Sequence, residues 1–205
     1  MSDEFEHLVD PTTGRQIAPE SVSIAQLVEG AKRGYRPYID LLYRRCRPAM
    51  LRVAGALARD QGDEFLEDVL TDAFMQLPRK LATYREEGRF EKFLAGVVFN
   101  IARTKLRARV RERNRYSDLV DDAHSRPPSA IWRALESDLL VRAAGILSDT
   151  EREVFILAHE GWTISEIAAG IGIRAGAVST RLSRARGKVR QALGGDGAPT
   201  VERDE

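Results

Sequence analysis

Apolar residues recur every three or four positions along most of this chain, which is the spacing of one face of an α-helix. The clearest case is segment 63–77, where one face is apolar and the opposite face is acidic and polar. The same spacing predicts helices that begin near Ser23 and just after Tyr35, and a fourth helix over roughly 89–113. Because no segment shows the alternation of a strand, the pattern predicts an all-α fold.

Prolines mark expected breaks in this pattern. Pro48 lies within the second predicted helix and should kink it, and Pro78 should end the third, because proline lacks the backbone N–H that a helix interior requires. Segment 114–130 is acidic and contains Pro127 and Pro128, which disfavour helix locally. We therefore expect two helical domains joined by a flexible linker.

The C-terminal segment has the pattern of a helix-turn-helix. Residues 148–151 and 163–166 each form a capping box, the sequence signal for a helix N-terminus. Residues 170–173 alternate glycine with isoleucine and predict a tight turn, and a longer basic helix follows over roughly 174–193. A short helix, a glycine turn and a longer basic helix are typical of DNA-binding domains.

The longer helix supplies two kinds of candidate DNA contact. Side chains near its start or on its outer face should reach base edges in the major groove, and basic side chains should meet phosphates. The alternative is a plain helical bundle with a solvated basic face. The candidates for base edges are Arg174, Ser179, Thr180 and Ser183, and those for phosphates are Arg181, Arg184, Arg186 and Lys188.

Charge is unevenly distributed in a chain whose formal net charge is only +1. Residues 1–30 carry a net charge of −5, whereas residues 103–115 carry +6 and residues 163–190 carry +5. Two separate basic segments suggest two contacts with an anionic partner such as nucleic acid. Two solvated helix faces are the simpler alternative.

Other features of the sequence disfavour secretion and catalysis. The acidic N-terminus lacks the apolar core of a secretory signal, and no apolar run approaches the ~18–20 residues of a membrane span. We therefore expect a cytoplasmic protein without membrane insertion. His7, His124 and His159 are scattered, and Cys46 is the only cysteine. We expect no catalytic site, no metal site and no cofactor.

The C-terminal segment 131–193 resembles the DNA-binding region of extracytoplasmic-function (ECF) sigma factors. The similarity is carried by residues 150–155, 166–168 and 178–186. Response-regulator DNA-binding domains share much of this pattern, so the C-terminal segment alone does not distinguish the two classes.

The N-terminal half distinguishes them. Residues 66–77 resemble the helix through which ECF sigma factors bind the polymerase, although Thr71 and Pro78 replace the usual glutamine and tryptophan. Residues 93–100, followed by 106–107, resemble the helix that melts and recognises the −10 promoter element. The resemblance implies a non-enzymatic protein that gives RNA polymerase its promoter specificity.

The resemblance also implies a domain organisation. A polymerase-binding and −10-recognition domain precedes a −35-recognition helix-turn-helix, and the two are joined by the linker. The expected parts are a variable N-terminal segment (1–20), sigma region 2 (21–113), the linker (114–130), sigma region 4 (131–193) and a disordered tail (194–205).

Candidate site residues follow from the resemblance and from helix spacing. An acidic patch on the third helix would bind a basic surface of core RNA polymerase, and the fourth helix would contact promoter DNA. Three of its arginines, four residues apart, share one side. The polymerase candidates are Glu67, Asp68, Thr71 and Asp72, and the −10 candidates are Tyr84, Asn100, Arg103, Arg107 and Arg111.

The expected partners are core RNA polymerase, promoter DNA, and an anti-sigma factor or another external regulator, such as a kinase that acts on Thr71. One alternative is a helix-turn-helix regulator that binds duplex DNA without the polymerase. Another is an interaction adaptor, which leaves both basic segments unexplained.

Overall fold

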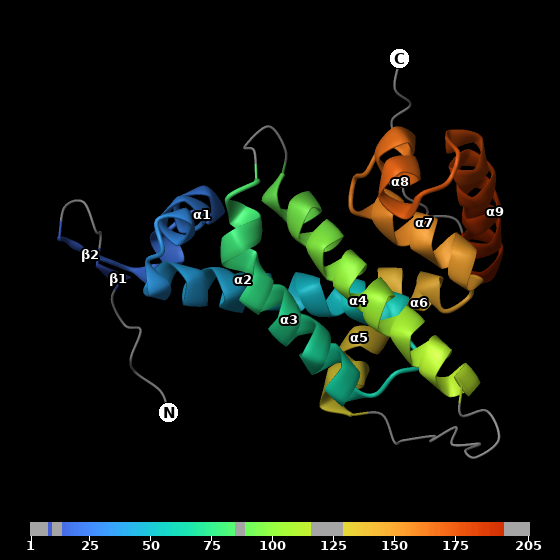
Figure 1. Cartoon of the computed structure of the whole chain (residues 1–205), viewed down its shortest axis with the longest axis horizontal. Helices are drawn as coiled ribbons and strands as arrows, with labels where there is room; N and C mark the ends of the chain where they lie inside the picture. The colour runs from blue at the N-terminus through green and yellow to red at the C-terminus, as the bar shows by residue number, and fades with distance from the viewer. Residues whose placement is uncertain (1–7, 10–13, 85–88, 116–128, 195–205) are drawn as a thin grey trace.

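The computed structural model describes residues 8–9, 14–84, 89–115 and 129–194. Within these residues the protein is built almost entirely of α-helices, so the predicted all-α fold is confirmed (Figure 1). The helices are α1 (Ile24–Lys32), α2 (Arg36–Leu57), α3 (Asp63–Leu81), α4 (Phe90–Arg115), α5 (Ala130–Glu136), α6 (Leu139–Ala144), α7 (Asp149–His159), α8 (Ile164–Ile171) and α9 (Ala175–Leu193), with one 3-10 turn at Pro19–Ser21.

A two-residue hairpin precedes the helices. Strand β1 (Leu8–Val9) pairs antiparallel with β2 (Gln16–Ile17), so that Leu8 lies opposite Ile17. The sequence did not predict these strands, because two residues are too few to show the alternation of a strand. Leu8 is buried, and its side chain anchors the hairpin to the helical core.

Helix α2 is the centre of the N-terminal half, because α1, α3 and α4 all pack against it. The expected start of α1 is confirmed: the Ser23 side chain accepts a hydrogen bond from the Gln26 backbone N–H and completes a capping box. Leu42 of α2, Leu66 of α3 and Phe99 of α4 are fully buried between these helices. The apolar faces predicted from the sequence therefore meet in one core.

Neither proline divides its helix. Helix α2 continues through Pro48, where the expected kink stays a prediction, and α3 continues through Pro78 to Leu81, so the prediction that Pro78 ends α3 is wrong. An interior proline costs a helix about 3 kcal/mol. The last turn persists because Leu77 and Leu81 are buried, and burial of a leucine contributes about 1.5–3 kcal/mol.

Helices α7, α8 and α9 form the expected helix-turn-helix. Ser148 and Thr163 each complete a capping box with the glutamate three residues later. Gly172 ends α8 with φ +76°, a left-handed conformation that glycine adopts without steric cost. Val178 and Leu182 of α9 are buried and hold the helix against the rest of this half.

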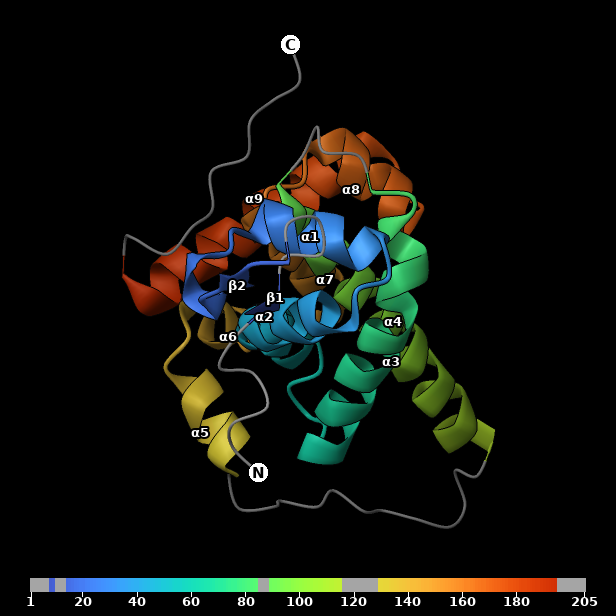
Figure 2. The same ribbon diagram turned by 90° about the vertical axis from the view of Figure 1, so that its left-hand side faces the viewer.

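The C-terminal half packs directly against the N-terminal half (Figures 1 and 2). Helix α2 contacts α5, α6 and α7. The approach is close: a Cβ added to Gly55 of α2 would lie 2.7 Å from the side chain of Leu135 in α5. The linker expected over 114–130 falls largely outside the described residues, and its ends belong to α4 and α5.

Candidate polymerase and nucleic-acid interfaces

The outer face of α3 carries the acidic residues expected to bind the polymerase. Asp68 and Thr71 are exposed on this face. Glu67 forms an ion pair with an arginine of α2, and a carboxylate oxygen of Asp72 lies 2.9 Å from Nζ of Lys105 in α4. The side chains of Glu67 and Asp72 remain 44% and 43% exposed. The whole face is therefore accessible, although two of its three carboxylates already have a cationic partner.

Met75 adds an apolar residue to this face. It follows Thr71 and Asp72 by four and three positions, which places it on the same side of α3. Its side chain is 74% exposed, more than any other large hydrophobic residue among those described. Methionine is enriched at protein interfaces and adapts to the shape of a partner. Met75 was not among the residues predicted from the sequence, although its helical spacing from the acidic residues could have identified it.

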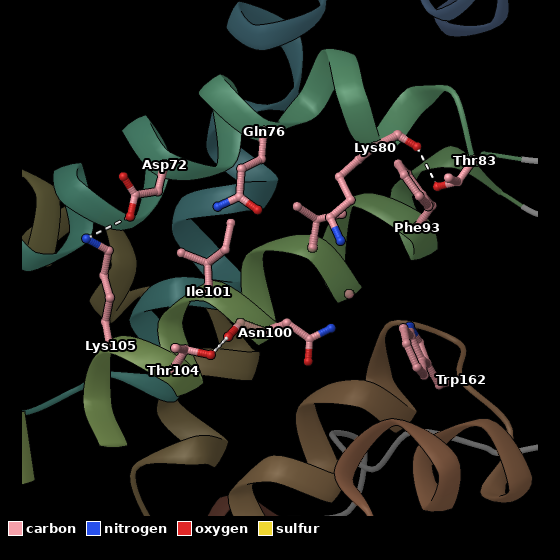
Figure 3. Close-up of a pocket in the computed structure, with 12 residues that line it drawn as sticks. Asp72, Gln76, Lys80, Thr83, Phe93, Asn100, Ile101, Thr104, Lys105 and Trp162 are labelled. Atoms are coloured by element: carbon pink, nitrogen blue, oxygen red, sulfur yellow. Dashed lines mark hydrogen bonds and ion pairs between the residues drawn. The ribbon is translucent and has the colours of Figure 1, made fainter. Parts of the chain in front are cut away.

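A cavity of about 500 Å³ lies between α3 and α4, and Asn100, which we expected to hold an unstacked base, is exposed at its lining (Figure 3). Phe93 and Val97 of α4 supply apolar lining beside it. The ring of Tyr84 packs against that of Phe93, with centroids 4.9 Å apart, and lies edge-on to the ring of Phe90. The structure therefore places Asn100 at the cavity and Tyr84 in the aromatic cluster that supports one side of it.

Trp162, in the turn between α7 and α8, lies across this cavity from α3 (Figure 3). Its indole N–H donates a hydrogen bond to the backbone carbonyl of Lys92 in α4, 3.3 Å away. Trp162 was not predicted as a site residue, because the residues that it contacts in α4 are far away along the chain. The cavity is thus shared by the two halves of the molecule.

The basic stripe expected on α4 is divided between two environments. Arg107 and Arg111 are exposed towards the end of the helix. The side chain of Arg103 is only 13% exposed, and its Nε lies 2.8 Å from a carboxylate oxygen of Glu153 in α7. Its Nη2 also donates to the backbone carbonyl of Ile171 in α8, at 3.2 Å. In this arrangement Arg103 is bound to the C-terminal half.

Helix α9 presents most of the residues expected to contact the −35 element. Arg174 is the N-cap residue of the helix, at the end expected to enter the major groove. The hydroxyl of Thr180 donates to the backbone carbonyl of Gly176, at 2.9 Å. The exposed candidates are Arg174, Ser179, Thr180, Ser183 and Arg184, and Arg181 is partly exposed.

Lys188 has a partner within the protein. Its Nζ lies 2.7 Å from a carboxylate oxygen of Glu151, whose side chain is 8% exposed. Burial raises the pKa of Glu151, but the hydrogen bonds from Lys188 and Ser148 lower it by a larger amount. The pKa of Glu151 is therefore about 2. Lys188 therefore neutralises a buried carboxylate at the start of α7, in addition to lying on the basic helix.

Arg186 lies in a second cavity, of about 470 Å³, between the start of α8 and α9. Ser179, Ser183 and Arg190 also line this cavity. The Nε and Nη2 atoms of Arg186 are buried and have no hydrogen-bond partner among the described residues. Burial and the nearby Arg190 lower the pKa of Arg186. Buried donors without an acceptor are costly, so the Nε and Nη2 atoms of Arg186 favour an anionic partner at this position.

Among the described residues, no group of three or more histidine, cysteine, aspartate or glutamate side chains is arranged to hold a metal ion. None of the helices in the described ranges combines the length and the apolar character that a membrane crossing requires.

Two family models match the chain in succession. The model for sigma-70 region 2 matches residues 42–112, which lie in α2–α4, and the model for sigma-70 region 4 matches residues 137–189, which include the helix-turn-helix. The α2–α4 bundle and the helix-turn-helix thus define a sigma factor of the sigma-70 type.

Curated relatives narrow this class. CarQ, an RNA polymerase sigma factor of Myxococcus xanthus, is 31% identical over 170 residues, which cover 82% of this chain and 95% of CarQ. SigM, an ECF RNA polymerase sigma factor of Mycobacterium tuberculosis, is 25% identical over 174 residues. These residues cover 84% of this chain and 85% of SigM. RfaY of Xanthomonas campestris is 28% identical over 156 residues, but the match spans 72% of this chain and only 38% of RfaY. The chain belongs to the ECF family and is an RNA polymerase sigma factor that directs transcription.

Two solved structures share the fold. RpoE of Bartonella quintana, crystallised with the anti-sigma factor NepR, has a TM-score of 0.53 at 23% identity and covers 75% of this chain and 96% of its own. CnrH, in complex with the cytosolic domain of CnrY, has a TM-score of 0.50 at 24% identity. The match covers 82% of this chain and 94% of CnrH. At these identities the likeness concerns the fold alone.

Proposed function

We propose that this sigma factor binds core RNA polymerase through the outer face of α3 and brings α4 and α9 to the −10 and −35 elements of a promoter. One observation carries the proposal: the same chain has an accessible acidic helix and, after it, a helix-turn-helix with a basic exposed face. This is the order of the two regions in the family. Complementary charge guides each surface to its partner, a basic polymerase surface for α3 and DNA phosphates for α4 and α9.

Each contact has a chemical role. On α3, the exposed carboxylates would attract the basic surface and Met75 would be buried at its centre. On α4, Asn100 would hydrogen-bond an unstacked base while the arginines contact phosphates. The proposed polymerase contacts are Glu67, Asp68, Thr71, Asp72 and Met75. The −10 contacts are Tyr84, Asn100, Arg103, Arg107 and Arg111. The −35 contacts are Arg174, Ser179, Thr180, Arg181, Ser183, Arg184, Arg186 and Lys188.

We also propose that residues 21–113 and 131–193 are the two functional units. Residues 114–130 would join them, 1–20 would be a variable N-terminal segment and 194–205 a C-terminal tail. The two family matches, which fall within these units, support the division. The protein would catalyse no reaction itself, since the proposed contacts only bind. It would act in the cytoplasm, where the polymerase and the chromosome are located.

External regulation by a protein partner belongs to the same proposal. The two structures of similar fold are complexes, one with the anti-sigma factor NepR and the other with the cytosolic domain of CnrY. A partner that covers α3 and the DNA-contacting surfaces together would prevent polymerase binding. Phosphorylation of Thr71 is a second route, because a phosphate would add about −1.5 to −2 charges to the exposed face.

Gel filtration with core RNA polymerase, followed by DNA binding with and without the core enzyme, tests the proposal. We expect the protein to elute with the core enzyme and to bind DNA sequence-specifically only as part of that complex. Sequence-specific binding to duplex DNA by the protein alone, without association with core enzyme, would instead establish the alternative of a free helix-turn-helix regulator.

A further inference from the structure

The C-terminal half covers part of the α4 surface that we assign to −10 DNA. Trp162 lies at the cavity that Asn100 lines (Figure 3). Glu153 of α7 forms an ion pair with Arg103 of α4. Asn100 and Arg103 are three residues apart on α4 and therefore lie on neighbouring parts of one face. The phosphate-contacting candidate Arg103 is thus engaged within the protein, whereas the base-contacting candidate Asn100 is exposed at a cavity that Trp162 also lines.

Two glycines allow Trp162 to pack against α4 and α8. A Cβ added to Gly96 of α4 would lie 2.4 Å from Cζ2 of Trp162, and one added to Gly170 of α8 would lie 3.1 Å from Cζ3. Glycine inside a helix costs roughly 1 kcal/mol relative to alanine. Close approach of the indole gives each glycine a packing role. The hydrogen bond to the Lys92 carbonyl fixes the position of the indole.

Among the described residues, three ion pairs join the two halves, and in each pair the N-terminal half supplies the cation. Nη2 of Arg52 lies 3.2 Å from Glu160, Nζ of Lys92 lies 2.7 Å from Glu166, and Nε of Arg103 lies 2.8 Å from Glu153. Arg103 and Glu153 are only 13% and 19% exposed, so solvent screens this pair less than a surface pair.

Of the three glutamates, only Glu153 binds a residue that we assign to DNA, and it does so at the guanidinium that would contact a phosphate. Carboxylates, like DNA phosphates, accept charge-assisted hydrogen bonds from arginine. The indole is a flat aromatic group, as is an unstacked base, and aromatic side chains are common stacking partners for bases. Glu153 and a DNA phosphate would compete for the same N–H donors of Arg103.

We infer that Glu153 and Trp162 form an intramolecular clasp, which holds the −10 surface of α4 in a closed state, and that single-stranded DNA binds this surface only by displacing them. The inference rests on the proposed function, because it takes α4 as the −10 surface. Only open molecules can bind single-stranded DNA at this surface. The apparent affinity of the free protein is therefore its intrinsic affinity multiplied by the fraction of molecules that are open.

Binding of the full-length protein to a fluorescent pool of short single-stranded DNA of random sequence, without polymerase, tests the clasp. Glu153→Gln breaks the ion pair and releases Arg103, so we expect the affinity to rise roughly three- to tenfold. Arg103→Gln breaks the same pair but removes the cation, so it should give no gain. Glu136→Gln, at an exposed carboxylate of α5, is the control for the change in net charge. No gain in Glu153→Gln, or an equal gain in Arg103→Gln or Glu136→Gln, would overturn the inference.

Trp162 fluorescence provides a second readout that does not depend on affinity. The chain has two tryptophans, so Trp132→Phe leaves Trp162 as the only one. Saturating DNA should shift its emission to longer wavelength and increase quenching by acrylamide, because the indole leaves the cavity. Unchanged emission and quenching at saturation would contradict displacement. Core association, measured on the same variants, should be unchanged; its absence in the unmodified protein would contradict the proposed function rather than the clasp.

Discussion

Lys188 illustrates how the surroundings of a single residue alter its expected role. Its position on the basic helix predicts a phosphate contact, but its Nζ lies 2.7 Å from Glu151. The sequence assigns Glu151 to the capping box with Ser148, and no local pattern indicates that the same carboxylate also binds Lys188, 37 residues later. The structure shows that one carboxylate serves both purposes. Arg184, one turn earlier, is exposed, so DNA binding is the only role that we propose for it.

The difference between these two residues is measurable. We expect Lys188→Ala to lower the free energy of unfolding by about 1–3 kcal/mol, because it leaves a buried carboxylate without its cationic partner. Arg184→Ala should change stability by less than about 0.5 kcal/mol while weakening binding to all DNA sequences alike. Urea unfolding and DNA binding at two salt concentrations compare the variants. Equal stability of the two variants would show that the Glu151 pair is not important for folding.

Helix α3 shows what the sequence can and cannot determine for a whole element. Its start, its apolar face and its acidic face were predicted from helical spacing alone. Its end was not, because the burial of Leu81 that carries the helix past Pro78 depends on tertiary packing. The capping boxes at Ser148 and Thr163 were predicted correctly because each is a local signal. The turn expected over 170–173 is confirmed at Gly172, but Gly170 and Ile171 still belong to α8.

The acidic face of α3 can be tested with one substitution. Asp68 is exposed, whereas Asp72 is paired with Lys105, so Asp68→Lys changes the charge of the face without breaking a contact between helices. We expect at least a tenfold weaker association with core polymerase, which corresponds to about 1.4 kcal/mol, and unchanged helical content by circular dichroism. Glu136→Lys on α5 makes the same change in net charge elsewhere on the surface. If both variants bind the core enzyme as the unmodified protein does, α3 is a solvated face.

At the scale of the whole molecule, the sequence predicted two domains but not their contact. The interface depends on pairs such as Lys92–Glu166 and Arg103–Glu153, whose members are far apart in the chain. Each of these residues, taken alone, has the pattern of a solvated charge on an amphipathic helix. Trp162 carries no signal of its own either, since the glycines that accommodate it lie on two different helices. Which faces meet is therefore decided by tertiary packing.

The central claim is that the two halves act together to start transcription at specific promoters. Run-off transcription from a pool of genomic fragments, with core polymerase and the purified protein, tests it most directly. The account predicts new transcripts whose start sites share two upstream elements, and it predicts that Asn100→Ala and Arg184→Ala each reduce their yield. Transcripts indistinguishable from those made by core polymerase alone would contradict it.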